Sequence, residues 1–301
     1  MLRKFALTAS AVAMLACATG ANAGVVFWDI DPAQSFVRLT VPDTNVTLSG
    51  IAATVRLRDP GSNTAWTDAG GRRVTLDGYI KTHYVEGSNY FDFRDGEHNI
   101  IGVPTVNLRP NPAAFDPNAT NSENPNGQYT NTSTAPAEFG ARVRVTVFVI
   151  ITVDAGFLAI RDLELDITGA PITMSGSGGN FGIAAGTSDF GIDSSKIYFD
   201  GLTVTGIGQP IPDVFAQTLG GFGGTNISSS TITNLGGLNR RLDYNINVPV
   251  SLVIEGITVS GTAAGKIVAF ATVPEFSSMG LLAAGGILST GAYFARRRRR
   301  S

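Results

Sequence analysis

The fold class is decided by the stretch RVRVTVFVIITV, residues 142–153. Its first half alternates arginine or threonine with valine, which is the period-two pattern of a strand with one buried face. Its second half, from Phe148 onward, is apolar on both faces, as in a strand that is covered on both sides. The sequence therefore predicts one strand that passes from a half-exposed edge into the centre of a sheet.

Similar stretches recur along the chain, separated by glycine, proline and asparagine. The stretches predicted as strands are residues 36–41, 46–48, 53–58, 73–80, 90–93, 157–168, 196–205, 242–257 and 266–272. No run of ten or more residues with helical periodicity precedes residue 273. The predicted fold is all-β, an antiparallel β-sandwich or barrel formed by residues 24–272.

A short pattern of alternating apolar and hydroxyl side chains, ending in glycine, occurs four times. The copies are VTLSG at 46–50, ITMSG at 172–176, LTVTG at 202–206 and ITVSG at 257–261. Each glycine is expected where the chain turns or bulges. Two interpretations stay open: two related β halves, or chance similarity between threonine-rich strands.

Both ends of the chain carry export features. Residues 1–23 have the basic, apolar and small-residue parts of a secretory signal peptide, with the signal peptidase site at Ala21 and Ala23. Cleavage there would make Gly24 the first residue. The single cysteine, Cys17, would be lost, so the mature chain has no disulfide or thiol chemistry.

The C-terminal end contains a charge-free run, residues 276–294. As a helix rising about 1.5 Å per residue it would span about 28 Å, close to the hydrocarbon thickness of a bilayer. A basic stop follows, formed by Arg296, Arg297, Arg298, Arg299 and Arg300. The sequence predicts one transmembrane helix with its N-terminus outside and its C-terminus inside; a core helix with a basic tail is the alternative.

The short motif Val273-Pro274-Glu275, the apolar run and the terminal arginines together resemble the PEP-CTERM sorting signal of exported Gram-negative proteins. The resemblance implies that a membrane transpeptidase, an exosortase, recognises residues 273–301 and cleaves near the motif. It also implies a role at the cell surface or in a biofilm matrix with exopolysaccharide. Phe276 departs from the family, in which a second proline is usual, and this puts the processing step in question.

The charge balance limits the partners. The whole chain has 22 basic and 24 acidic residues. The signal peptide holds two of the basic ones, and the tail holds five basic and one acidic, so the remainder carries a net charge of −8. A domain of this charge is poorly suited to nucleic acid or to an anionic membrane surface.

Residues 109–138 interrupt the strand pattern with proline and asparagine and with few aliphatic side chains. Such a composition offers few contacts to a core, so a long exposed loop or linker is expected. A disordered or mobile segment is favoured over a functional loop.

The residues with possible chemistry are few. His83 and His98, with Glu86 nearby, match no metal-ligand spacing, and a solvated polar loop is favoured over a metal site. The sequence leaves metal binding unknown and gives no reason to expect a cofactor. No nucleophile elbow, phosphate loop or nucleotide fingerprint is present, and the glycines of residues 176–191 are expected in turns.

Three carboxylates, Asp162, Glu164 and Asp166, alternate along one predicted strand and so share a face. A glycosidase pair would need a second carboxylate across a cleft. A row of oxygen ligands could share a calcium ion. The favoured interpretation is the solvent face of an amphipathic strand.

Residues 28–35, WDIDPAQS, and the strand after them resemble the opening of the YceI-like lipid-binding β-barrels. Similar openings occur in other PEP-CTERM ectodomains. The resemblance implies a barrel with an apolar interior.

Three functions follow from these features. The favoured one is a non-enzymatic surface or matrix protein that is exported, held in the inner membrane by one helix, and sorted to the outer surface or the medium. The alternative is a carrier that holds a lipid or glycan in a cavity. A secreted carbohydrate-active enzyme is the third.

Overall fold

The computed structural model describes residues 24–48, 51–60, 73–94, 97–121, 125–148, 151–201, 213–218, 222–254 and 257–273. The predicted signal peptidase site, the sorting residues Pro274 and Glu275, the terminal arginines and the transmembrane helix lie outside these residues. No helix in the part described is long and apolar enough to cross a membrane.

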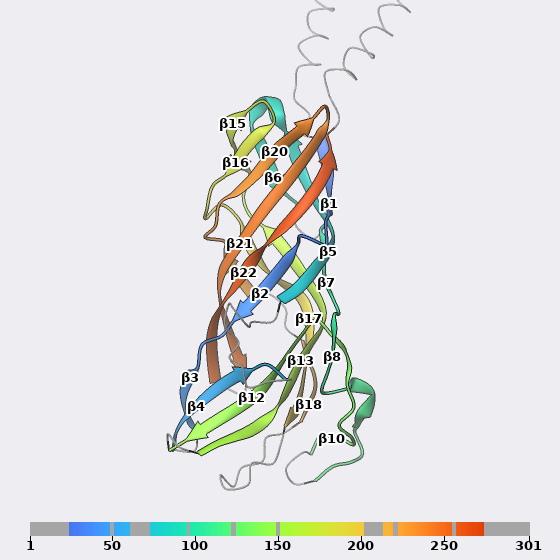
Figure 1. The fold of residues 1–301 in the computed structure, drawn as a ribbon, viewed down its shortest axis with the longest axis vertical. Coiled ribbons are helices and arrows are strands. Elements are labelled where there is room, and N and C mark those ends of the chain that lie inside the picture. Colours follow the sequence, from blue (N-terminus) through green and yellow to red (C-terminus); the bar gives the residue numbers. More distant parts are fainter. Residues whose placement is uncertain are drawn as a thin grey trace, which may run out of the picture.

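The predicted all-β fold is confirmed over the described residues (Figure 1). Its helical elements there are two short 3₁₀ turns, η1 (Glu86–Ser88) and η2 (Pro112–Ala114). The strands of the first half are β1 (Gly24–Ile30), β2 (Phe36–Thr40), β3 (Thr44–Leu48), β4 (Ile51–Arg58), β5 (Arg73–Val85), β6 (Tyr90–Phe93), β7 (Asn99–Val103), β8 (Val106–Leu108), β9 (Phe115–Asp116), β10 (Gln128–Tyr129), β11 (Ala135–Ala137) and β12 (Phe139–Val147). Those of the second half are β13 (Ile151–Thr168), β14 (Ile172–Thr173), β15 (Ser175–Ser177), β16 (Asn180–Ile183), β17 (Asp189–Gly201), β18 (Val214–Thr218), β19 (Phe222–Thr225), β20 (Ser230–Gly236), β21 (Asn239–Ile254) and β22 (Ile257–Thr272).

Antiparallel pairings close into a ring at the upper end of Figure 1. β22 pairs with β1, β1 with β5, β5 with β6, and β6 with β14. β14 continues through Met174 into β15, and the ring returns through β16, β20 and β21 to β22. Of the two predicted architectures, this end is therefore a barrel. Lower down, β2 takes the place of β1 between β22 and β5, and the wall continues through β7, β13 and β17.

Aromatic side chains fill the upper interior of the barrel. Trp28, Tyr84, Phe91 and Tyr244 have no exposed surface. Trp28 and Tyr84 meet edge to face with ring centroids 5.9 Å apart, and the indole N–H of Trp28 donates to the hydroxyl of Thr82 at 2.8 Å. Because each large ring buries much apolar area in a favourable geometry, this cluster stabilises this end of the barrel.

The prediction of one strand over residues 142–153 is wrong. β12 ends at Val147, β13 begins at Ile151, and the two pair antiparallel from Val147 opposite Ile151. Phe148 lies at the turn with φ of 51°. The predicted strand over residues 242–257 is broken in the same way, because Ile254 lies opposite Ile257 in the β21–β22 hairpin. The first turn falls within an apolar run, so no turn residue marks it, whereas Glu255-Gly256 marks the second in the sequence.

The recurring pattern does not mark turns at every copy. Residues 257–261 lie inside β22, which continues straight through Gly261. A Cβ at Gly261 would lie 2.4 Å from the carbonyl oxygen of Thr40, so this glycine allows close approach of β2 rather than a turn. The copy at 202–206 lies outside the described residues.

The segment of residues 109–138 has more contacts than its composition predicted. β9 pairs with β10, and β11 pairs with β8. The guanidinium of Arg161, in β13, donates to the carbonyl oxygens of Leu108, Ala135 and Pro136 at 2.9, 3.2 and 2.8 Å. Arg109 of the segment also pairs with Asp200, and the backbone N–H of Tyr129 donates to Asp213 at 3.1 Å, so the expectation of few contacts is wrong.

A β-bulge directs Arg161 toward that segment. The register between β13 and β17 shifts after Arg161, and the next residue, Asp162, has φ of 54°. Leu158 and Ile160 point inward before the bulge, and Leu163 and Leu165 point inward after it. The extra residue thus shifts the alternation by one position. The predicted strand over 157–168 is present, but its alternation is not continuous.

Candidate functional site

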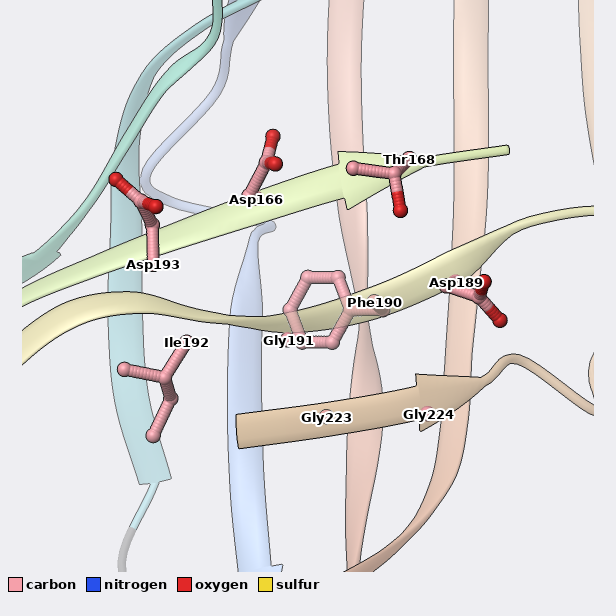
Figure 2. A pocket seen from close by; sticks show the side chains of 9 residues that line it. All are labelled: Asp166, Thr168, Asp189, Phe190, Gly191, Ile192, Asp193, Gly223 and Gly224. Carbon is pink, nitrogen blue, oxygen red and sulfur yellow. The ribbon is translucent and has the colours of Figure 1, made fainter. Parts of the chain in front are cut away.

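A hollow lies on the outer face of three neighbouring strands, β13, β17 and β19 (Figure 2). In the register Asp166 lies opposite Gly191, and Gly191 lies opposite Gly223. The residues that line it are Asp166, Thr168, Asp189, Phe190, Gly191, Ile192, Asp193, Gly223 and Gly224. We refer to it as the acidic hollow.

Glycines form the floor of the acidic hollow because the strands approach closely there. A Cβ at Gly223 would lie 2.4 Å from the Cα of Gly191 and 2.5 Å from the carbonyl oxygen of Phe190. No side chain fits in that space without backbone movement. The hollow therefore exists because two glycines face each other across β17 and β19.

Three carboxylates surround this floor, with Asp166 between Asp193 and Asp189 in Figure 2. Asp189 and Asp193 are exposed, and Asp193 lies at an irregularity in the pairing of β17 with β13. Asp166 accepts from the backbone N–H of Ile167 at 2.8 Å. The arrangement gives a locally negative surface that disfavours anionic ligands.

A metal centre is not assembled from these side chains. Within the residues described, no group of three or more histidine, cysteine, aspartate or glutamate side chains is placed to hold a metal ion. The carboxylates of the acidic hollow are spread along the strands rather than turned toward one point (Figure 2).

The three carboxylates of β13 singled out in the sequence do not act together. Asp162 forms an exposed ion pair with Lys196 at 2.9 Å. Glu164 accepts from the hydroxyl of Ser194 at 3.1 Å. Asp166 alone reaches the acidic hollow. Each carboxylate thus has a separate environment on the outer face, as expected for the polar side of an amphipathic strand.

His98 is buried, which the sequence did not predict. Its side chain is 1% exposed. Nδ1 accepts from the backbone N–H of Lys81 at 3.2 Å, and Nε2 lies 2.8 Å from the carbonyl oxygen of Ile167. The imidazole in its neutral form, with the proton on Nε2, satisfies both contacts and so links β5 to β13. The expected solvated loop is wrong for this residue.

His83 and Glu86 lie elsewhere. His83 is half-buried on β5, opposite Asp92. Glu86 accepts from the guanidinium of Arg240 at 2.7 Å, and Arg240 also donates to two backbone carbonyls of the β20–β21 turn. Burial, together with the charge of Glu86, raises the pKa of Tyr84 to about 12. Tyr84, Glu86 and Arg240 thus link β5 to the β20–β21 turn.

Sequence reasoning missed Arg161, Arg240, Asp189 and Asp193. The two arginines have partners that are far away in the sequence, so no local pattern marks them. The two aspartates do stand in an alternating stretch, SDFGID at residues 188–193, that was interpreted as turn material. Its period-two pattern was the available signal.

Comparison with known proteins gives no assignment for the chain. No family model, no curated protein and no solved structure matches it. The resemblances to PEP-CTERM proteins and to YceI-like proteins stay predictions from the sequence.

Proposed function

We propose that this chain is an exported bacterial protein without enzymatic activity, which serves at the outer surface or in the extracellular matrix. Export uses the signal peptide, and sorting by an exosortase-like membrane transpeptidase uses Val273, Pro274 and Glu275. Before processing, one helix holds the protein in the inner membrane with its N-terminus outside. Exopolysaccharide or another matrix component is the partner class.

The observation that carries the proposal is where the folded domain begins and ends. β1 starts at Gly24, the first residue after the predicted signal peptidase site, and Gly24 already pairs with Tyr84. β22 ends at Thr272, and Val273 is still buried, with its N–H donating to the carbonyl oxygen of Leu238. The described barrel thus lies between the two predicted processing points.

The first and last described residues, Gly24 and Val273, lie at one end of the barrel. β1 and β22 are antiparallel neighbours, with Asp29 opposite Phe270, so Gly24 and Val273 lie at the same end. A tail that starts there would hold the barrel upright on a membrane, with its other end pointing away. This geometry suits a displayed domain.

The alternatives have less support. A carrier needs an enclosed apolar space, but aromatic rings occupy the upper interior of the part described. A carbohydrate-active enzyme of the glycosidase type needs two carboxylates that face each other, but Asp162 and Glu164 are separate and engaged with Lys196 and Ser194. The packed core and the separated carboxylates favour a structural role.

The test is the intact mass and location of the protein in a host with the sorting enzyme and in one without it. We expect loss of the chain after about Pro274, with release from the inner membrane, only where the enzyme is present. The variant P274A/E275Q changes the motif without altering buried Val273 and should keep its tail. Equal masses in both hosts would overturn the sorting step.

A further inference from the structure

The lower end of the barrel carries an exposed apolar turn. Phe148 is 63% exposed and Ile151 is 49% exposed, and both stand where β12 turns into β13. We call these two side chains the hairpin tip. The β3–β4 hairpin reaches the same level, because Ala53 lies opposite Val147 and the chain turns two residues beyond it. Figure 1 shows both hairpins at the end opposite to β15 and β20.

Phe148 is unfavourable for folding on two counts. Its φ of 51° is in the left-handed region, which glycine and asparagine adopt easily and bulky residues rarely do. Its ring also gains little from burial, since most of it faces solvent. A residue that stability does not favour at this turn points to a role outside folding.

Four arginines lie just behind the hairpin tip. In the pairing of β4 with β12, Arg56 lies opposite Arg144 and Arg58 lies opposite Arg142. We call them the arginine quartet. Like charges directly opposite across two strands repel each other.

Two carboxylates of the described residues, Asp43 and Asp154, pair with the arginine quartet. Asp43 contacts Arg56 at 3.0 Å and Arg58 at 2.8 Å. Asp154 contacts Arg144 at 3.1 Å and also pairs with Arg142. These six side chains together keep a charge of +2, although the domain as a whole is acidic. The charge of this group of side chains is therefore opposite in sign to that of the domain.

We propose that the hairpin tip and the arginine quartet form a docking surface for a lipid membrane with anionic headgroups. Arg144 precedes Phe148 by four residues, about 13 Å along a strand. If the ring enters the acyl boundary to a depth of about 5–10 Å, Arg144 and Arg56 lie at the level of the lipid phosphates. The apolar hairpin tip thus matches the acyl region of a membrane, and the arginine quartet behind it matches the layer of anionic phosphates.

A soluble polyanion is disfavoured because it would use the arginine quartet and leave the exposed Phe148 without a role. The docking surface lies at the end opposite to Gly24 and Val273, so it would meet a lipid surface other than one that holds the tail. The inference uses the tip alone and does not depend on whether the tail is cleaved.

The test is capture of lipid vesicles by the full chain, immobilised through a C-terminal tag so that the tip faces outward. Vesicles contain phosphatidylcholine alone, or equal amounts of phosphatidylcholine and phosphatidylglycerol. Every variant carries the same tail, so any binding through the tail is common to all. We expect the wild type to prefer the anionic vesicles, with a preference that weakens as salt is added.

The decisive variant is F148N, because asparagine tolerates the left-handed turn and should leave the melting temperature unchanged or higher. We expect it to bind anionic vesicles about tenfold more weakly. The matched control, L235N, removes a side chain of similar exposure, 52%, at the opposite end and should bind as the wild type does. Equal binding by F148N and wild type would overturn the proposal.

A second variant, R56Q/R144Q, removes two of the four arginines. The two that remain balance Asp43 and Asp154, so the charge of +2 on this group is lost. We expect about thirtyfold weaker binding to anionic vesicles and little change on neutral ones. The third measurement adds inorganic polyphosphate as a soluble competitor of the vesicles. If it binds to wild type and F148N alike and abolishes vesicle capture from both equally, the surface is a polyanion site and the lipid proposal fails.

Discussion

Arg161 is the side chain whose loss has the most specific expected effect. It is 7% exposed, and its guanidinium lies 5.1 Å from the ring centre of Tyr198. It donates to three backbone carbonyls, one at the end of β8 and two in β11. Hydrogen bonds from a charged donor contribute about 1.5–3 kcal/mol each. Desolvation of the guanidinium, which also lowers the pKa of Arg161, costs several kcal/mol. The gain from the three hydrogen bonds minus the cost of desolvation leaves a net stabilisation of about 3 kcal/mol, which R161M should remove.

This loss should appear in the segment and not in the barrel. β13 keeps its ladders with β12 and β17, whereas Arg161 holds β11 and the end of β8 against the wall. We expect R161M to raise amide hydrogen exchange in the segment about a hundredfold, with β21 and β22 unchanged.

R161K is the matched control, since lysine keeps the charge but lacks the planar fork that reaches carbonyls on two sides. It should fall between R161M and the wild type. Unchanged exchange in the segment of R161M, or an equal rise in β21 and β22, would refute the reasoning.

Two further substitutions test local packing and burial. G223A should lower the free energy of unfolding by about 1–3 kcal/mol in denaturant titration, because its Cβ would overlap the backbone of Gly191. In the control G224A the new Cβ meets only ordinary contacts, so stability should stay unchanged. Equal losses in the two variants would contradict the close approach of β17 and β19. Burial raises the pKa of Glu138, so its contribution to stability is greatest at low pH and is lost as pH rises through the raised value. E138Q should therefore match the wild type in acid and exceed it by about 1 kcal/mol at neutral pH; a constant difference across pH would exclude this cause.

Local patterns in the sequence predicted the strands well where side chains alternate between core and solvent. Residues 53–58, 73–80 and 90–93 fall within β4, β5 and β6. The pattern failed at the β12–β13 turn, where the turn residues are as apolar as the strands that they join. Hydrophobicity alone cannot locate a turn in such a run.

The site and the segment depended on contacts between distant residues. His98 is buried because a backbone N–H of β5 and a carbonyl of β13 meet its two nitrogens. Arg161 is buried because carbonyls more than twenty positions earlier in the chain surround it. Neither the composition of residues 109–138 nor the spacing of the histidines indicates these partners. Sequence reasoning therefore placed residues 109–138 and His98 in solvent.

The pairing of the first strands with the last one limits when this protein can fold. β22 completes the ladders of β1, β2 and β21, so three strand edges lack a partner until it arrives. If the chain is exported as we propose, N-terminus first, the closing strand emerges last. The nascent chain would then have to be kept from aggregating throughout translocation, and a product truncated before β22 would expose those edges to proteases.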